Sequence, residues 1–387
     1  MESSTSSSPA NAGLRKHFGK LSDPRIDRQK LHELFDIVVI TICAVICDAD
    51  GWTEVVAFGK AHEAWFRTFL KLPNGIPSHD TFGRVFSLLD AQQLQASFVG
   101  WVGEMARLKV GSVVAIDGKK LRGSRERMSG KQAVEMVSAW ASEAGLVLGQ
   151  MRVGEGTNEI GTVPELLKVL ALRGCIVTVD AANCQTENAR LITEQAGDYV
   201  FALKGNQGTL HSQVQQAFEH ESLSQFKHVR HSTFEEVDKR DGHVETRRYI
   251  LIHDQDYIDY LNPTERWWHL AGVGRVEREW RDHMGALKRD CRFFITSLSQ
   301  GDGELFARAV RHHWHIENQL HWCLDIAFRE DDCRIHVGHA AQNLAVLRHI
   351  ALNLLKQDTS VKLGIKSKRK LAGWDNDYLL HLIANLF

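Results

Sequence analysis

The sequence predicts an α/β protein, in which a mixed sheet with helices on its faces follows an all-helical region and contains a β-rich insertion. Apolar residues recur at steps of three and four from 23 to about 89, which is the spacing of amphipathic helices. Between 111 and 203, short apolar runs alternate with helix-length stretches, as in sheets covered by helices. Between 206 and 298, a polar helix precedes long strands without that alternation.

The composition is that of a globular protein with more than one domain. The 387 residues are 43% hydrophobic and include 10 tryptophans, enough for two or three domains. A net charge of -1 means that any surface for nucleic acid must be local. The 7 cysteines contain no CxxC pair, which favours free thiols in a reducing cytosol. The longest apolar run, 37–47, is too short to span a bilayer, so we expect a cytoplasmic protein without a membrane partner.

Four parts follow one another along the predicted chain. In the helical domain, Ser78 is the predicted N-cap before an apolar helix face. The domain suits either a helix-turn-helix module for DNA or a plain packing domain. In chain order we expect a disordered tail (1–20), the helical domain (21–105), the sheet domain (110–355) with its β insertion at about 222–298, and a basic, partly loop-like segment (356–387).

The elements of the sheet domain come in a characteristic order. Three strands precede an alternation of helix and strand, which is the order of ribonuclease H-like folds. Gly161 or Thr162 starts the first helix ahead of Pro164, and a long helix at 304–328 follows the insertion. The expected strands are 113–117, about 134–141, 146–153, 175–180 and 199–203, with helices near 162–172 and 186–196.

Three acidic residues stand where a folded protein avoids an unpaired charge. Asp117 ends the apolar run that begins at Val113, and Asp180 ends the run that begins at Cys175. Glu317 interrupts an apolar stripe of one helix face, and the stripe consists of Val310, Trp314, Glu317, His321, Leu324 and Phe328. Carboxylates in such places are paired or bound to metal.

Each acid also has an ordinary structural explanation. Aspartates after strands often cap turns, and Glu317 has His313 and His321 one turn away as ion-pair partners. The two aspartates together are more informative, because neighbouring strands would place two repelling carboxylates side by side. Oxygen ligands select magnesium or manganese. Two such ions support the in-line displacement of a phosphodiester.

Basic residues near the first acid and near the C terminus predict contacts to phosphate. Lys119, Lys120 and Arg122 leave the strand beside Asp117, which favours a phosphate clamp. The segment 125–131 is equally well explained as a solvated loop. Arg247 shares a strand face with His243 and Glu245, either solvated or against DNA. The C-terminal run adds sequence-independent DNA affinity through Lys366, Lys368, Arg369 and Lys370.

The chain resembles the DDE transposases of bacterial insertion sequences, and among them the H-repeat-associated group found beside Rhs elements. The resemblance extends from about residue 23 almost to the C terminus. The matching strings, in order, are GIPSHDTFGRVFSLLD, AIDGKKLRGS, VTVDAANCQTENA, YVFALKGNQ, DGHVETRRY, HHWHIENQLHWCLDIAFREDDCRI, NLAVLRHIALNLLK and KRKLAGWDNDYL.

The resemblance implies a ribonuclease H-like catalytic domain in which Asp117, Asp180 and Glu317 are the catalytic and metal-binding triad. It implies cleavage at insertion-sequence ends and strand transfer into target DNA, with two magnesium or manganese ions. The partners would be double-stranded DNA, as inverted-repeat ends and target, and a second protomer in a homodimer on DNA. Lys204, in the fourth string, would contact that DNA, and the protein would be nucleoid-associated.

Two departures from the family pattern concern residues around the acids. Ala182 and Asn183 replace an expected Met-Gly after the second aspartate. The Tyr, Arg and Lys that some related transposases place around the glutamate are replaced at the same offsets by Val310, His313 and Leu324. Arg311 and His313 are the candidate substitutes for contacts to DNA.

Two other functions remain open on the sequence alone. The first is a hydrolytic nuclease of the same fold that cuts DNA without joining it. The second is a catalytically silent DNA-binding remnant of a transposase, and the presence of all three acids argues against it.

Overall fold

A computed structural model describes most of the chain. Within the described part, no helix is both long and apolar enough to cross a membrane. The first fourteen residues of the expected tail lie outside the described ranges, whereas residues 15–18 are helical. Part of the basic loop at 125–131 also lies outside them. The described ranges are 15–125, 132–154, 156–240, 243–282 and 284–384.

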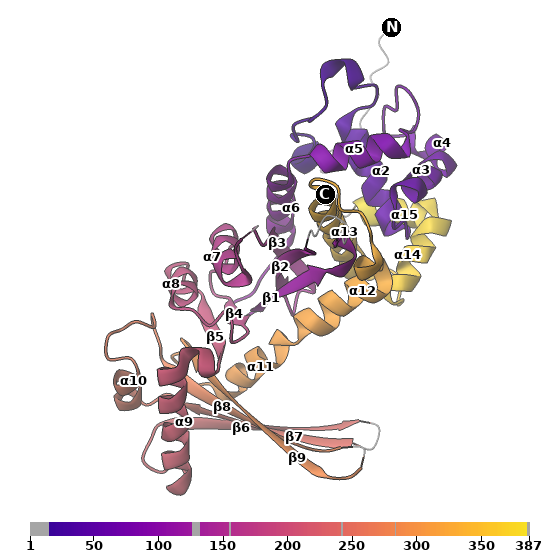
Figure 1. Ribbon diagram of the computed structural model, residues 1–387. Helices are drawn as coiled ribbons and strands as arrows, with labels where there is room; N and C mark the ends of the chain where they lie inside the picture. Colours follow the sequence, from indigo (N-terminus) through magenta and orange to yellow (C-terminus); the bar gives the residue numbers. More distant parts are fainter. Residues whose placement is uncertain (1–14, 126–131, 155, 241–242, 283, 385–387) are drawn as a thin grey trace.

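The centre of the molecule is a mixed sheet whose nine described strands run in the order β3-β2-β1-β4-β5-β9-β8-β7-β6 (Figure 1). β4 lies parallel to β1 and to β5, and the other neighbouring pairs are antiparallel. The strands are β1 (Val113–Leu121), β2 (Val134–Ala141), β3 (Leu146–Arg152), β4 (Ile176–Val179), β5 (Asp198–Leu203), β6 (His231–Arg240), β7 (His243–Ile252), β8 (Gly272–Arg281) and β9 (Leu287–Thr296).

The first strand is longer than the sequence predicted. We expected it to end at Asp117, but β1 continues to Leu121, because β2 pairs with it as far as the couple of Leu121 and Val134. β4, in contrast, pairs with β1 only up to the couple of Ile116 and Val179. Asp117 and Asp180 are therefore the first residues beyond the end of the parallel ladder, on neighbouring strands.

The β insertion extends the central sheet instead of forming a separate layer. β9 returns from the insertion and pairs antiparallel with β5, and β8, β7 and β6 follow outward from it. Helices α9 (Gly208–Leu223) and α10 (Gln255–Leu261) accompany these strands in the lower part of Figure 1. The observed strands, from 231 to 296, lie inside the range expected for the insertion.

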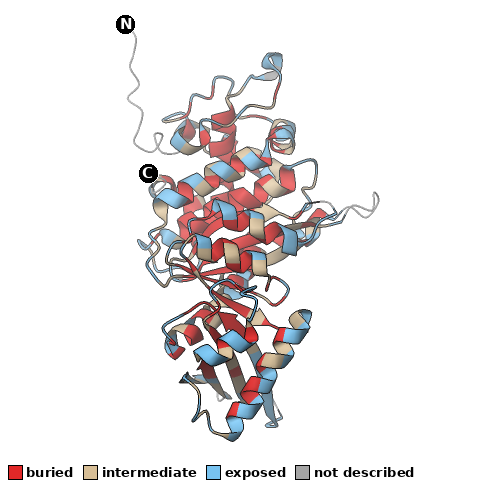
Figure 2. Cartoon of the chain, turned by 90° about the vertical axis from the view of Figure 1, so that its left-hand side faces the viewer, coloured by how far each residue is buried: buried red, intermediate tan, exposed pale blue. Residues whose placement is uncertain are grey.

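The N-terminal helices pack on a helix from the other end of the chain. All thirteen residues of α2 (Leu34–Ile46) are buried, and α2 lies against α13 (Ala340–Gln357). Buried residues run through the middle of the molecule, where these helices meet the sheet (Figure 2). The cap at Ser78 is confirmed, because its side chain accepts a hydrogen bond from the Thr81 backbone. The other helices here are α3 (Trp52–Ala61), α4 (Glu63–Phe66), α5 (His79–Leu88) and α6 (Ala91–Met105).

The C-terminal segment is partly loop-like, as expected, because residues 358–364 form neither helix nor strand, and two helices follow them. These helices are α14 (Ile365–Trp374) and α15 (Asn376–Ala384). Both pack on α13, and α14 also contacts α2. The buried residues of α14 are Lys368, Arg369 and Ala372, so part of the basic run faces the interior of the protein.

The remaining helices flank the sheet and connect its two ends. α7 (Glu159–Val169) and α8 (Thr186–Glu194) precede β4 and β5. The predicted long helix after the insertion is present as one helical run, in which α11 (Gly303–His313) is followed by a π-helical turn (Ile316–His321) and α12 (Trp322–Phe328). In Figure 1 this run crosses diagonally from the insertion to the helical part.

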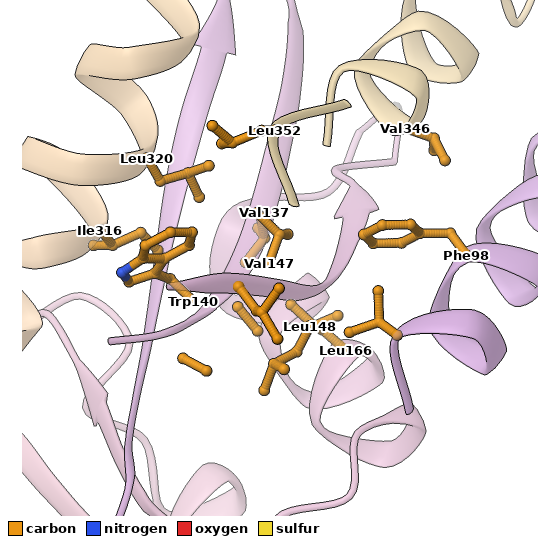
Figure 3. Close-up of a cluster of buried hydrophobic side chains, with 14 of the residues drawn as sticks. Phe98, Val137, Trp140, Val147, Leu148, Leu166, Ile316, Leu320, Val346 and Leu352 are labelled. Carbon is orange, nitrogen blue, oxygen red and sulfur yellow. The ribbon is translucent and has the colours of Figure 1, made fainter. Parts of the chain in front are cut away.

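The side chains on either side of Glu317 anchor this run to the sheet. Ile316 and Leu320 are buried and lie beside Trp140 of β2 in the apolar cluster of Figure 3. Trp140 is fully buried, so the cluster leaves little freedom for the backbone that carries Glu317.

Candidate active site

The three predicted acids line one cavity. Asp117 comes from β1, Asp180 follows β4, and Glu317 comes from the π-helical turn. The cavity has a volume of about 800 Å³ and extends away from the acids between α9, β8 and β9. The fold thus brings together residues that are up to 200 positions apart in the sequence.

Asp117 has the most perturbed environment of the three acids. Burial raises the pKa of Asp117 to about 7. The carboxylates of Glu159, Asp180 and Glu317 act in the same direction, while the backbone N–H of Gly118 opposes them. Among the described residues, its nearest ion-pair contact is with His321, whose Nδ1 lies 3.7 Å from Oδ2 of Asp117. That distance is too long for a hydrogen bond.

Asp180 is held by the loop that follows it. Asn183 donates to Oδ1 of Asp180 from both its backbone N–H and its side-chain amide, each at 3.0 Å. The same amide donates to Oε1 of Glu159 at 2.5 Å. Asn183 is fully buried, so it links the second predicted acid to a further carboxylate that the sequence did not reveal.

Glu159 brings a fourth carboxylate to the site. It is the first residue of α7, whose N-cap is Asn158. Its carboxylate lies directly over Gly118, since a Cβ at that position would stand 2.6 Å from Oε2 of Glu159. Burial raises the pKa of Glu159, the Asn183 hydrogen bond lowers it, and the charge of Asp180 raises it further.

The sequence did not reveal Glu159 because we placed the start of α7 too late. We expected the helix to begin at Gly161 or Thr162, but Asn158 accepts a hydrogen bond from the backbone of Gly161 and starts it two residues earlier. The sequence did contain a signal for the earlier start. Asn158 and Glu159 stand before the apolar helical pattern, and an N-cap residue followed by an acid in the first turn is typical of a helix start.

Glu317 lies in a π-helical turn that interrupts the predicted stripe. Trp314 and Glu317 are exposed toward the cavity, whereas His321, Leu324 and Phe328 are buried. The extra residue of a π turn rotates the helix between these two groups. Such turns are rare and are often found at functional sites, and here the turn directs the glutamate into the cavity while its neighbours stay packed.

The two histidines near Glu317 are neutral packing residues at pH 7. Burial lowers the pKa of His313 to about 4, against the charge of Asp180. Nδ1 of His313 lies 3.0 Å from the hydroxyl of Thr178. Burial also lowers the pKa of His321 to about 4. Both rings therefore add shape and hydrogen-bonding groups beside the acids, without adding positive charge.

Lys119 does not have the free side chain that a phosphate clamp requires, so that expectation is corrected. Only 10% of the side chain is exposed. Its Nζ lies 2.6 Å from Asp325, 3.2 Å from Glu330 and 3.3 Å from Asp331. Arg348 reaches Glu330 from the other side at 3.5 Å. Lys119 therefore ties β1 to α12 and to the segment that follows it.

Two residues of the C-terminal basic run are also corrected. Lys368 is buried and donates to the backbone oxygens of Leu355 and Asp358. Arg369 is fully buried, and its guanidinium pairs with Asp48 at 2.8 Å. Neither side chain can reach DNA from these positions.

The other predicted DNA contacts are exposed or line a cavity. Lys120 and Arg122 expose 67% and 83% of their side chains, and Lys204 lines the cavity beside the acids, as does His313. Arg247 and Arg311 line a second, smaller cavity. Lys366 and Lys370 are exposed on α14.

Comparison with protein families agrees with the arrangement of these acids. A family model described as "Transposase DDE domain" matches residues 108–354, and one described as "DDE_Tnp_1-associated" matches residues 15–102. The chain belongs to the DDE transposase family.

Similar proteins narrow the group within the family. The H repeat-associated putative transposase YhhI of Escherichia coli (strain K12) is 36% identical over 375 residues, covering 96% of this chain and 97% of that protein. The putative transposase YncI of Escherichia coli O157:H7 is 35% identical over 373 residues, covering 96% and 94%. This DDE transposase is therefore a bacterial member of the H-repeat-associated group.

One solved structure has a weak likeness to the whole chain. It is the cryo-EM structure of a piggyBac transposase synaptic complex with hairpin DNA, at a TM-score of 0.38 and 11% identity, covering 97% of this chain and 76% of that one. A likeness at this level carries no argument.

The donor set of this DDE transposase fits a hard divalent cation, which its family generally uses. Four carboxylates face the same region, and oxygen ligands of this kind suit magnesium or manganese. Within the described residues, however, no three His, Cys, Asp or Glu side chains already stand close enough together to hold a metal ion. The chemistry of the side chains fits the cation, and their spacing is wider than a closed coordination sphere.

Proposed function

We propose that this protein cleaves DNA at the ends of an insertion sequence and transfers the cut strand into target DNA, in a metal-dependent reaction. The observation that carries the proposal is the meeting of Asp117, Asp180 and Glu317, from three separate elements, in one cavity. By the resemblance of the sequence motifs, each would be one of the three acids of the family pattern. Within the described residues, no lysine or arginine lies within 4.0 Å of these carboxylates to neutralise them.

The topology supports a ribonuclease H-like catalytic domain. Strands β3, β2 and β1 are antiparallel neighbours, and β4 and β5 continue in parallel. This order, with helices between the later strands, is the one we expected for that fold. The insertion then enters between β5 and the helical run that carries Glu317.

Each residue of the site has a distinct task in this proposal. Asp117, Asp180 and Glu317 would hold two magnesium or manganese ions, which activate the attacking hydroxyl and stabilise the departing 3′ oxygen when bound. Asn183 orients Asp180 through two hydrogen bonds. Lys204, at the mouth of the same cavity, would position a phosphate of the bound strand.

The remaining expectations about partners belong to the same proposal. Lys120, Arg122, Lys366 and Lys370 are exposed cations that would contact duplex DNA outside the site. Two ends must meet before joining, so we propose that two protomers act together on inverted-repeat ends. The protein would then work in the cytoplasm, in association with the nucleoid.

Substitution of the first acid tests the assignment of the site. We expect Asp117→Ala to lower magnesium-dependent nicking of element-end DNA about a thousandfold or more, because bound ions supply several kcal/mol of transition-state stabilisation. End binding should remain. Asp259→Ala, an exposed acid on α10, is the matched control and should nick normally. Unchanged nicking by Asp117→Ala would remove Asp117 from the active site.

A target plasmid separates the transposase from a hydrolytic nuclease of the same fold. The substrate is the DNA that flanks the gene, where short inverted repeats bordered by a direct duplication would mark the ends. Incubation of the labelled ends with plasmid should yield joined product. Nicking without any joined product would support the nuclease, and binding without nicking would support a silent remnant.

A further inference from the structure

A second cavity lies beside the active-site cavity and is lined by four arginines. Its volume is about 280 Å³. We call these four residues the arginine cradle: Arg247 on β7, Arg278 on β8, Arg292 on β9 and Arg311 on α11. Three neighbouring strands and the helix that leads to Glu317 therefore direct their guanidinium groups to one place.

The register of the sheet places two of these cations in direct opposition. Arg247 and Arg278 are cross-strand partners in the ladder between β7 and β8. Like charges directly opposite one another on antiparallel strands destabilise a sheet. An arrangement of this kind needs negative charge from elsewhere.

Acids of the protein supply only part of that charge. Glu245 pairs with both Arg247 and Arg278. Asp290 pairs with Arg292 at 2.8 Å, and Glu236 lies 3.4 Å from Arg311. Among the described residues, the four arginines therefore meet three carboxylates, which leaves one positive charge in excess.

Two guanidinium nitrogens of the cradle are buried without a hydrogen-bond partner in the part of the chain that the structure describes. They are Nη1 of Arg247 and Nε of Arg278. A buried donor on a charged group that lacks an acceptor is costly. Burial lowers the pKa of Arg247, and the charges of Arg311 and Arg278 lower it further, against the charges of Tyr249 and Glu236. Oε1 of Glu245, beside Arg247, also has no hydrogen-bond partner among the described residues, so the acids of the cradle do not match all of its donors in direction.

The cradle is continuous with the active-site cavity. Both cavities are lined by Arg292 and Trp314, and the guanidinium of Arg292 lies 5.4 Å from the centre of the Trp314 ring. Asn318, the residue after Glu317, also lines the cradle. A DNA strand whose reacting phosphate faces the acids could therefore place a neighbouring phosphate in the cradle.

We propose that the arginine cradle binds a phosphodiester of the DNA strand that runs past the active site. Guanidinium groups hold phosphate oxygens with pairs of parallel hydrogen bonds, and the unpartnered nitrogens are donors of the required kind. This inference rests on the proposed function, because it assigns one more contact to the same DNA. It also gives the β insertion a role in holding substrate.

Salt-dependent binding to a labelled duplex oligonucleotide of arbitrary sequence tests the cradle. Each phosphate contact contributes about 0.9 to the slope of log affinity against log salt concentration. We expect Arg247→Gln and Arg278→Gln to reduce that slope by about 0.9 and to lower affinity about tenfold, as for a charged hydrogen bond. The matched control is Arg248→Gln, on the same strand but the opposite face, where Arg248 is exposed and pairs with Glu235.

The comparison between variants on the two faces of β7 decides whether the cradle binds phosphate. If Arg247→Gln and Arg278→Gln bind like Arg248→Gln, or lose affinity without a change of slope, the cradle holds no phosphate and the proposal is wrong. Should either strand variant have a lowered Tm, Arg311→Gln on α11 repeats the test from outside the sheet. Nicking is measured separately, so a wild-type protein that binds DNA but does not nick contradicts the proposed function and leaves this test intact.

Discussion

Two clusters of acids surround Asp117 and Lys119, which stand two residues apart on β1. The clusters differ in whether nearby cations neutralise their carboxylates. The paired cluster surrounds Lys119 and contains Lys119, Arg348, Asp325, Glu330 and Asp331. The unpaired cluster surrounds Asp117 and contains Asp117, Glu159, Asp180 and Glu317. In the described part of the chain, only His321 comes within ion-pair distance of the second set.

This difference separates structural acids from acids available for chemistry. Glu330 is almost fully buried and is retained beside two cations, which is how buried charge is normally tolerated. The carboxylates of the unpaired cluster repel one another in a partly buried place. Titratable groups with perturbed pKa values of this kind concentrate at functional sites. Lys119 and Arg348 neutralise the acids of the paired cluster, and in the proposed function a divalent cation would neutralise those of the unpaired cluster.

The largest expected effect on stability comes from breaking the paired cluster. Glu330→Ala leaves the buried guanidinium of Arg348 without its carboxylate, and breaking a buried pair costs about 3 kcal/mol or more. Glu317→Ala removes a carboxylate from a set that repels itself, and should not lower the free energy of unfolding. Urea unfolding of both variants without metal measures the difference. Equal losses from the two variants would contradict the distinction between the clusters.

The sequence predicted the acids of the unpaired cluster better than it predicted their surroundings. Asp117 and Asp180 could be found because each ends an apolar run, and a strand-forming run has a readable end. The side-by-side placement of these two residues followed from the expected order of strands and is confirmed by the register. These features depend on local pattern, which a single sequence contains.

Contacts between segments that are far apart in the sequence could not be predicted from local pattern. Lys119 appeared to be free because its three carboxylate partners are more than 200 positions away in the sequence. Arg369 appeared to be a surface cation because nothing local shows that Asp48 lies beside it. The π turn at Glu317 was missed for a different reason, since a regular helical spacing was assumed across it.

The pH dependence of stability gives a second, smaller contrast. The pKa of Asp117 is raised to about 7 in the folded protein, above the unfolded value of about 3.9. The folded state then binds more protons, so stability is full below about pH 4 and falls as the pH rises toward 7. A pKa shift of this size corresponds to about 4 kcal/mol in the free energy of unfolding. We expect roughly half of that, because 29% of the Asp117 side chain is exposed and solvent screens its charge.

Asp117→Asn isolates this contribution from every other titrating group. In EDTA, the wild-type protein should lose about 2 kcal/mol more than the variant between about pH 4 and about pH 8. Urea unfolding at the two pH values gives both free energies. Parallel pH profiles for the two proteins would show that Asp117 is not held in an unfavourable environment.

The smallest expected effect tests the position of Glu159 within the unpaired cluster. A methyl group at Gly118 would meet the Glu159 carboxylate at 2.6 Å, and this end of a flexible side chain can move away. Gly118→Ala should therefore change the free energy of unfolding by less than about 1 kcal/mol, yet displace the fourth carboxylate and release Asn183 from it. We expect nicking to fall about tenfold, the cost of about 1.4 kcal/mol in the transition state.

Glu159→Gln is the matched variant for this comparison, because it removes the charge without displacing the side chain and keeps an oxygen that can accept from Asn183. If Glu159 acts by its charge, Glu159→Gln and Gly118→Ala should both nick more slowly. If it acts only by orienting Asn183, and through it Asp180, Glu159→Gln should nick at the wild-type rate while Gly118→Ala is slow. Wild-type nicking by both variants would place Glu159 with the structural acids of the paired cluster.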